Sequence, residues 1–150
     1  MLNERWILTA AHCVINSIPW HKIVVKLGKH DTQVDEDHEI HTRIADFSGV
    51  IEHPDYVSNN YDNDLALVRL RDRVSFSEYI RPICLADRNL SEKWLDENET
   101  TGPKTGTVVG WGKLKEKGLS PRYLQEIKLP IVNSEVCRKS TNYSVSILCF

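Results

Sequence analysis

Residues Trp6–Cys13 read Trp-Ile-Leu-Thr-Ala-Ala-His-Cys, an apolar run that passes through small residues into a histidine and a cysteine. A short apolar run of this kind is typical of a β-strand, so His12 is predicted to follow a strand. The small residues before it leave its ring uncrowded. Taken alone, a histidine in this position is more often structural than catalytic, and a second motif is needed to decide.

That second motif is Asp64–Leu67 (Asp-Leu-Ala-Leu), which opens a run that is apolar to Leu70 except for Arg69. Such a run is typical of a strand buried on both faces. An acid at its start must be solvated or paired, because burying a bare carboxylate is costly. A histidine could use it: Asp64 would accept a hydrogen bond from one ring nitrogen and leave the other as a base. Asp62 is the rival candidate, but it lies farther from the strand.

The rest of the chain repeats short strand patterns separated by long polar loops. Further strands are predicted at Lys22–Gly28, within Ile40–Ile51, and at Thr105–Trp111, Tyr123–Val132 and Ser146–Phe150. Asn133–Lys139 opens with cap-type residues and an acid and ends on basic residues, which predicts one short helix near residues 133–140. Together these patterns indicate an all-β sandwich or barrel.

Bulk properties exclude several function classes. The 150 residues suggest one domain, and the hydrophobic fraction of 41% is enough for a core. The net charge of −2 with mixed signs gives no electrostatic footprint for nucleic acid or for an anionic membrane. No apolar run approaches the ~18 residues of a membrane-spanning helix, so no transmembrane segment is expected.

The amino-terminal residues carry no apolar core of a signal peptide. Three N-glycosylation triplets nevertheless begin at Asn89, Asn98 and Asn142, which favours a secreted, extracellular protein and a missing upstream segment. The four cysteines allow three disulfide pairings if all are oxidised, and the alternative is four free buried thiols in a cytosolic protein.

Three motifs, in this order, resemble the trypsin/chymotrypsin-like serine proteases: Thr9–Cys13, Asp64–Leu67 and Gly110–Gly112 (Gly-Trp-Gly). The resemblance implies an incomplete double six-stranded antiparallel Greek-key barrel. Residues 1–90 would form most of the first barrel, 91–102 the connection, and 103–150 the first half of the second. It also implies that His12 is the general base and Asp64 its orienting acid, acting on a protein or peptide substrate.

Finer detail resembles the blood-clotting branch of that family. Arg81–Leu85 resembles the segment whose cysteine bonds the catalytic domain to a light chain, so Cys84 is expected to lack a partner within this chain, as is Cys13. By the same resemblance, Cys137 and Cys149 would form a disulfide, and closing a loop of that size contributes roughly 3 kcal/mol.

The chain also departs from the family pattern. None of its serines lies in the Gly-Asp-Ser-Gly-Gly-Pro loop that carries the nucleophile. We therefore expect an internal piece of a secreted serine endopeptidase that is inactive as given, because it lacks the nucleophile, the oxyanion hole and the specificity pocket. The competing hypothesis is a non-catalytic protease homologue that acts as a binding module.

The loop Lys29–Glu39 resembles the segment that holds calcium in many relatives. Asp31, Glu36 and Glu39 are the weak calcium candidates, since carboxylate oxygens are the ligands that this ion prefers. However, Lys29 stands where calcium-binding members carry a glutamate, and its ammonium is expected to pair with a loop acid, plausibly Glu39. We expect that no cofactor is required, and a solvated acidic loop is the plain alternative. His38 and His41 are not expected to share a metal, because residues three apart share a face only on a helix.

Overall fold

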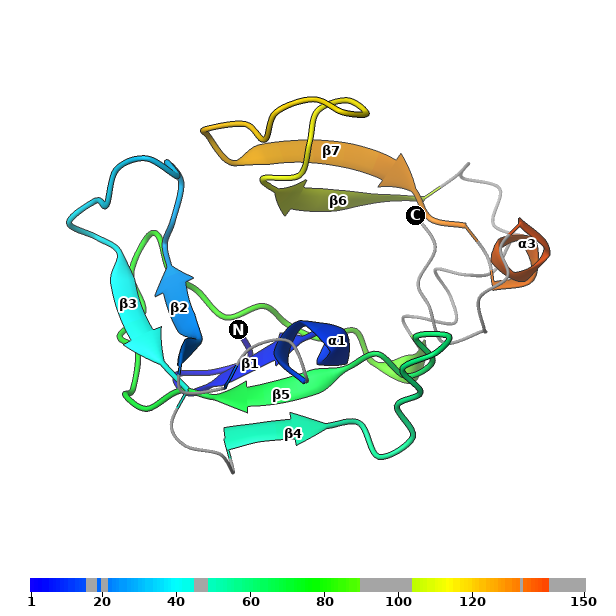
Figure 1. The fold of residues 1–150 in the computed structure, drawn as a ribbon, viewed down its shortest axis with the longest axis horizontal. Coiled ribbons are helices and arrows are strands. Elements are labelled where there is room, and N and C mark those ends of the chain that lie inside the picture. The colour runs from blue at the N-terminus through cyan, green and yellow to red at the C-terminus, as the bar shows by residue number, and fades with distance from the viewer. Residues whose placement is uncertain (16–18, 20–21, 45–48, 90–103, 133, 141–150) are drawn as a thin grey trace.

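The computed structural model describes residues 1–15, 19, 22–44, 49–89, 104–132 and 134–140. Strands dominate this part of the chain, which confirms the all-β prediction (Figure 1). The elements are, in order, β1 (Trp6–Thr9), α1 (Ala11–Val14), β2 (Val24–Leu27), β3 (Ile40–Arg43), β4 (Val50–Glu52), β5 (Ala66–Arg69), β6 (Thr105–Gly110), β7 (Gln125–Pro130) and α3 (Ser134–Ser140).

The described strands form three separate antiparallel sheets. β5 lies at the centre of the largest sheet, between β1 and β4, while β2 pairs with β3 and β6 pairs with β7. Isolated bridges extend these ladders, among them one between Ile44 and Leu70 that joins the end of β3 to the end of β5. Within the described residues the sheets do not close into a barrel.

The strand that follows Asp64 differs from its prediction in burial. Along β5 and its flanks, Ala66, Val68 and Leu70 are buried, Leu67 and Arg69 are half-buried, and Leu65 is 47% exposed. This alternation means that β5 buries one face rather than two. Its other face also carries apolar residues, but that face is only partly buried because none of the described elements covers it fully.

The core lies where the start of the chain, the β2–β3 sheet and the segment after β5 meet. Leu70, Val74 and Ile80 are its buried centre. Partly buried side chains surround them: Met1, Ile7, Val25, Leu27 and Ile40. Val25 and Leu27 thus lie on the inward face of β2, while Val24 and Lys26 are exposed, as the alternation of side chains along a strand requires.

Two of the predicted elements can be compared directly with the structure. The stretch Ile40–Ile51, within which strand structure was predicted, holds two strands, β3 and β4. The helix predicted at Asn133–Lys139 is present as α3, and an ion pair of 2.7 Å between Glu135 and Lys139, one turn apart, supports it. The predicted connection at 91–102 and the predicted strand Ser146–Phe150 lie outside the described residues.

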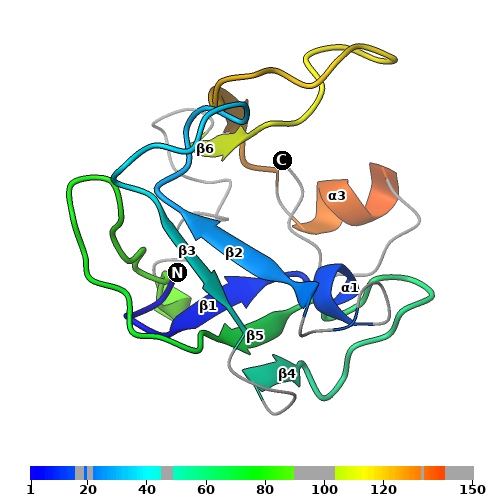
Figure 2. The same cartoon turned by 60° about the vertical axis from the view of Figure 1, so that its left-hand side comes forward.

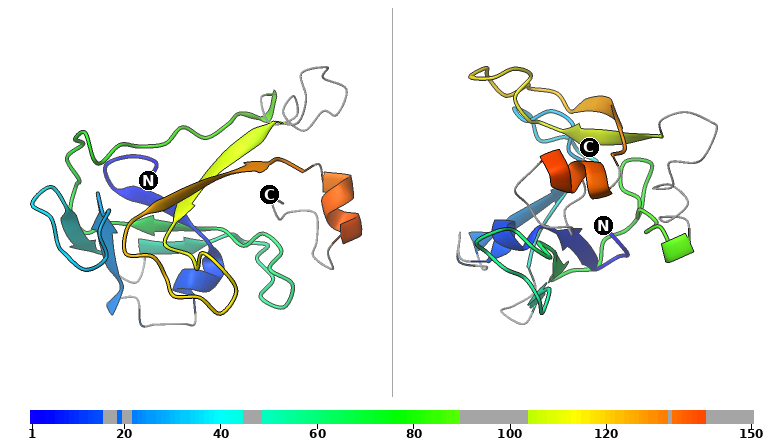
Figure 3. Two further views of the ribbon diagram at one scale, coloured as in Figure 1. Left: turned by 90° about the horizontal axis from the view of Figure 1, so that it is seen from above. Right: turned by 90° about the vertical axis from the view of Figure 1, so that its right-hand side faces the viewer.

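The β6–β7 hairpin lies on one side of the β1–β5–β4 sheet, as Figure 3 shows. Its contact with the first half of the chain runs through the β2–β3 loop, whose tip reaches the hairpin in Figure 2. Asp31 forms an isolated antiparallel bridge with Tyr123, and His30 O accepts hydrogen bonds from Leu124 N at 3.0 Å and from Trp111 Nε1 at 3.2 Å. α3 lies at the opposite end of the molecule from this loop (Figure 1).

Candidate active site

The register of the β1–β5 pair brings His12 and Asp64 together. Thr9 pairs with Ala66 at the end of the ladder, so the residues after Thr9 run alongside the residues before Ala66. Extending this antiparallel pairing by two places sets Ala11 opposite Asp64, and α1 starts there. His12 is therefore beside Asp64 although 52 positions separate them in sequence.

The two side chains are in direct contact. His12 Nδ1 lies 2.6 Å from Asp64 Oδ2, and the backbone N–H of His12 donates to Asp64 Oδ1 at 2.9 Å. The carboxylate thus holds both the ring and the backbone of the same residue. Since an ionised carboxylate can only accept, Nδ1 carries the ring proton and Nε2 is the basic nitrogen of the neutral imidazole.

The two partners differ in solvent exposure, at 50% for the side chain of His12 and 16% for that of Asp64. Burial acts to raise the pKa of Asp64, but hydrogen bonds from the His12 N–H, the His12 ring and the Ala11 N–H outweigh it, and the pKa is lowered. Asp64 is therefore an anion at neutral pH. A fixed negative charge beside Nδ1 stabilises the imidazolium that would form on proton uptake.

Two tyrosines that sequence reasoning did not single out stand near this pair. The ring of Tyr61 meets the His12 ring edge-on, with centroids 5.5 Å apart. Burial raises the pKa of Tyr56, and the negative charge of Asp64 adds to that effect. No pattern in the sequence marks either tyrosine, because both lie in a loop whose path is set by backbone turns, with positive φ at Tyr61 and Asn63.

The rival acid, Asp62, takes a different role. Its backbone N–H donates to Asn60 Oδ1 at 3.1 Å, and its backbone carbonyl accepts from Val57 N at 2.9 Å. These contacts close the turn that precedes β5. The preference for Asp64 over Asp62 as the partner of His12 agrees with this geometry.

The cysteines and glycosylation candidates are only partly described. Cys13 and Cys84 are free and exposed, whereas Cys137 is buried on α3 and disulfide-bonded. Its predicted partner, Cys149, lies outside the described residues, so that pairing stays a prediction. Asn89 is exposed, while Asn98 and Asn142 also lie outside the described residues.

The β2–β3 loop is organised around the ammonium group of Lys29. Lys29 Nζ donates to Asp35 Oδ1 at 2.8 Å, to Glu39 Oε1 at 3.0 Å and to the carbonyl of Val34 at 2.7 Å. The predicted contact with Glu39 is thus present, and Asp35 is a partner that sequence reasoning did not name. These contacts raise the pKa of Lys29, and the hydrogen bond to Asp35 is the largest cause.

The three weak calcium candidates do not converge on one point. Asp31 faces Arg122, whose Nε and Nη2 approach its carboxylate at 2.9 and 2.6 Å, and this pairing lowers the pKa of Asp31 to about 2. Glu39 hydrogen-bonds Lys29 and His41. Glu36 Oε2 is buried without a hydrogen-bond partner. His38 Nε2 donates to the Gly28 carbonyl at 3.0 Å.

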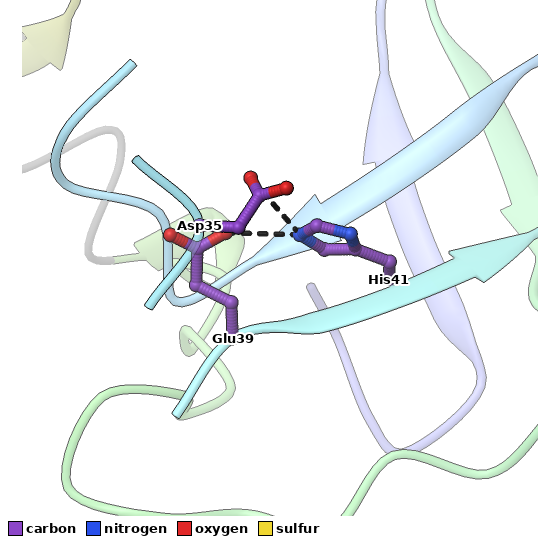
Figure 4. Close-up of side chains that lie close together, drawn as sticks. All are labelled: Asp35, Glu39 and His41. Carbon is purple, nitrogen blue, oxygen red and sulfur yellow. Dashed lines mark hydrogen bonds and ion pairs between the residues drawn. The ribbon is translucent and has the colours of Figure 1, made fainter. Parts of the chain in front are cut away.

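Another set of potential metal ligands does gather in this loop. Asp35, Glu39 and His41 offer ligand atoms within 4.8 Å of one another (Figure 4). His41 Nε2 lies 2.9 Å from Glu39 Oε2 and 3.8 Å from Asp35 Oδ1. Lys29 already contacts both carboxylates, so the charge that would attract a cation is largely balanced by the chain itself.

Comparison with known proteins agrees with this geometry. The sequence matches the trypsin family, described as Trypsin, over residues 1–150. It is also similar to coagulation factor IX of Cavia porcellus, with 35% identity over 147 residues, which is 97% of this chain and 47% of that relative. The chain therefore spans about half the length of the curated relative it matches. With the motifs in order, the His12–Asp64 contact formed and the match extending along the whole sequence, the chain belongs to the trypsin family of serine proteases.

Proposed function

We propose that His12 and Asp64 are the general base and the orienting acid of a secreted serine endopeptidase of the blood-clotting type. The observation that carries this proposal is the 2.6 Å contact between His12 Nδ1 and Asp64 Oδ2. The identity to coagulation factor IX supports the branch, and family membership supports a protein substrate. Among the described residues, no helix is both long and apolar enough to cross a membrane.

The chemistry follows from the proton positions. With its proton held on Nδ1 by Asp64, His12 presents Nε2 as the acceptor for the hydroxyl proton of a nucleophilic serine. The imidazolium that results lies against an anion, and it later returns the proton to the leaving amine. The pair supplies the proton transfer, while attack on the carbonyl needs a serine that the chain as given does not place in the family's nucleophile motif.

The chain as given is accordingly proposed to be inactive. Incubation with a panel of fluorogenic Arg and Lys ester substrates is expected to give no turnover above background. Turnover that His12→Ala abolished would contradict this proposal. His53→Ala is the matched control, because His53 hydrogen-bonds the backbone N–H of Asp55 rather than a carboxylate.

The parent protein supplies the complementary test. The transcript that encodes this chain is expected to continue into a Gly-Asp-Ser-Gly-Gly-Pro motif, and the protein it encodes to hydrolyse such esters. His12→Ala in that protein should then lower kcat by at least about 10⁴-fold, the scale seen when a triad member is removed. A transcript with no serine in that motif would instead favour the alternative function, a non-catalytic homologue that acts as a binding module.

For the β2–β3 loop, we propose that Lys29 takes the place of a divalent cation, so that no cofactor is required. The three contacts of its ammonium with Val34, Asp35 and Glu39 support this, because they use the oxygens that a calcium ion would otherwise need. Calorimetric titration with calcium is expected to show no binding below millimolar concentration. Lys29→Glu is expected to gain affinity; sub-millimolar binding by the unaltered chain would refute the proposal.

Cys84 is proposed as the attachment point of a disulfide-linked light chain. Support comes from its exposure together with that of its neighbours, Ile83 at 67% and Leu85 at 63%, which places an apolar strip around a free thiol. Non-reducing electrophoresis of the secreted parent protein should show a heavier species that Cys84→Ser removes. Migration unaffected by that substitution would count against a light chain at this position.

A further inference from the structure

The β2–β3 loop and the segment after β5 enclose a pocket of about 440 Å³, which is within the usual size of ligand sites. Its lining residues are Gly28, Lys29, His30, Glu36, His38 and Tyr79. In Figures 1 and 2 the β2–β3 loop lies apart from α1, which carries His12. The pocket is therefore separate from the candidate active site.

One wall of the pocket is a pair of stacked aromatic rings. The rings of His38 and Tyr79 have centroids 3.8 Å apart and an interplanar angle of 21°. His38 is held in this position because its Nε2 donates to the Gly28 carbonyl at 3.0 Å. Gly28 has a φ of 76°, and a Cβ there would lie only 3.2 Å from Ile80 Cγ1, so a glycine is needed at this point. Tyr79 is 60% exposed, so much of its ring is open to a ligand.

Glu36 is the acid of the pocket, and no lysine or arginine among the described residues forms an ion pair with it. Its Oε2 is buried without a hydrogen-bond partner, which costs free energy. His38 Nε2 lies 3.9 Å from that oxygen, too far for a hydrogen bond. The Glu36 side chain as a whole is 36% exposed. Rotation about its last bond exchanges the two oxygens, so a ligand in the pocket can reach the carboxylate.

The charges around the pocket favour a positively charged ligand. The ammonium of Lys29 is balanced by Asp35 and Glu39, at 2.8 and 3.0 Å, so it compensates little of the charge of Glu36. Asp37 is an exposed acid next to Glu36 and adds negative charge to the same part of the loop. A cation in the pocket is therefore attracted, while an anion is repelled.

We propose that this pocket binds the guanidinium group of an arginine side chain from a partner protein. A guanidinium is planar and always charged, so it can donate two parallel hydrogen bonds to the Glu36 carboxylate and stack on the open part of the Tyr79 ring. A lysine ammonium lacks the planar fork. Arginine side chains that fill pockets are common among the residues that dominate binding between proteins. The inference goes beyond the proposed peptidase function and does not depend on it.

The experiment titrates the full chain, labelled with nitrogen-15, with an arginine blocked at both ends as N-acetyl-arginine methylamide. A single side chain binds weakly, so the titration extends into the millimolar range. The backbone amide signals of Glu36 and His38 should shift and saturate, while that of His12 should stay in place. The citrulline counterpart has a neutral urea in place of the guanidinium. It should bind at least about 10-fold more weakly, the factor for one lost charge-assisted hydrogen bond. The lysine counterpart should also bind more weakly.

Three substitutions separate the contributions of charge and ring. Glu36→Gln keeps the size of the side chain but removes its charge, and it should weaken binding of the arginine compound at least about 10-fold. Tyr79→Leu removes the aromatic face and should weaken binding about 2- to 5-fold, as for an exposed cation–π contact. Asp37→Asn is the control, because Asp37 is an exposed acid of the same loop that does not line the pocket. It should weaken binding by no more than about 2-fold, since solvent and salt screen its charge.

Several outcomes would overturn the proposal. Equal binding of the arginine and citrulline compounds by the unaltered chain would do so even if a variant fails to fold, as would the absence of any saturable shift. Equal or tighter binding of the lysine compound would indicate a general cation site instead. Free arginine that bound at least about 10-fold more tightly than the blocked compound would indicate a small-molecule site. Shifts centred on His12 would place the ligand at the candidate active site. Ester hydrolysis by the parent protein tests the proposed function separately from all of these.

Discussion

Asp64 gives His12 a fixed orientation because its two carboxylate oxygens accept hydrogen bonds from two donors of that residue. Oδ1 accepts from the His12 backbone N–H and Oδ2 contacts Nδ1. An asparagine would place an NH2 donor where one of these two oxygens lies, so it cannot present an acceptor to both the backbone N–H and Nδ1–H of His12. The charge and the second acceptor are thus both needed to hold the ring with its proton on Nδ1.

Asp64→Asn should therefore release the ring and destabilise the fold slightly. We expect a loss of about 1.5–3 kcal/mol in the free energy of unfolding, as for one hydrogen bond to a charged group. In nitrogen-15 NMR spectra of the histidine rings, the signals of His12 should shift toward a mixture of tautomers. Asp62→Asn is the control: its carboxylate does not contact His12, so the His12 ring signals should stay as they are. Unchanged ring signals in Asp64→Asn would contradict the assigned role.

Only part of this site could be predicted from the sequence around His12 and Asp64. The apolar strand after Asp64 made a paired carboxylate the expected outcome, and His12 was its natural partner. The closeness of Cys13 Sγ to Nε2 and the edge-on contact with Tyr61 depend on the turn of α1 and on loop dihedral angles, which residue types do not reveal.

At the scale of elements, the β2–β3 connection is a loop held together by charge. Hydrogen bonds from Lys29 and Lys26 lower the pKa of Asp35 to about 2. For Glu39, burial acts to raise the pKa, but hydrogen bonds from His41, Lys29 and the Glu36 N–H outweigh it and bring the pKa to about 2. Both acids stay ionised in the folded loop at a pH where an unfolded chain would already bind protons.

This loop should consequently weaken in acid. A carboxylate whose folded pKa lies below its unfolded value, near ~4, contributes stability above that value and loses it as the pH falls toward 2. We expect the free energy of unfolding to decline between about pH 4.5 and 2, and Glu39→Gln to flatten that decline. Asp37→Asn, which removes an exposed acid of the same loop that does not contact Lys29, is the control. Urea titrations across this pH range measure the effect, and parallel curves for Glu39→Gln and the unaltered chain would contradict it.

Element boundaries were predictable where the local pattern was long enough. β6, β7 and α3 were recognised from alternation or from cap and charge signals. α1 was not, because a helix of four residues carries less than two turns of periodicity and depends on its position at the end of β1. The expectation that the strand after Asp64 is buried on both faces failed, since β5 is covered on only one.

At the scale of the whole molecule, an ion pair between Asp31 and Arg122 joins the first half of the chain to the second. Arg122 donates hydrogen bonds to Asp31 from two guanidinium nitrogens, and Asp31 is only 7% exposed. Beside it, Thr32 N donates to the Arg122 carbonyl and Leu124 N to the His30 carbonyl. A bidentate pair next to backbone hydrogen bonds gives this contact a defined register.

Arg122→Met should loosen that contact. It leaves the Asp31 carboxylate buried without its cation, so amide hydrogen exchange at Thr32 and Leu124 should be at least about tenfold faster, the factor for one lost charge-assisted bond. Arg73→Met is the matched control, because Arg73 pairs with Glu4 where both side chains are exposed and such pairs contribute little. Unchanged exchange at both amides would show that the backbone bonds hold the contact alone.

The hydrophobic core packs between the sheets and includes Leu70. Leu70 is fully buried, at the bridge between the ends of β3 and β5. Leu70→Ala should lower the free energy of unfolding by about 2–5 kcal/mol, because it removes a packed side chain and leaves a cavity. Leu119→Ala, at a position 91% exposed, should change it by no more than about 0.5 kcal/mol. Chemical denaturation measures both, and equal losses would contradict the assignment of the core.

What the amino-acid sequence determined alone was the class of fold, the membership in a protease family and the pairing of His12 with Asp64. Strand alternation and the cost of burying an unpaired carboxylate are local rules, so they can be read along the chain. The tertiary structure decided which oxygens Lys29 contacts, that Asp31 pairs with Arg122, and that Cys13 Sγ lies close to His12 Nε2. Those contacts join atoms whose distance depends on register and loop dihedral angles, and these emerge only when the strands pack.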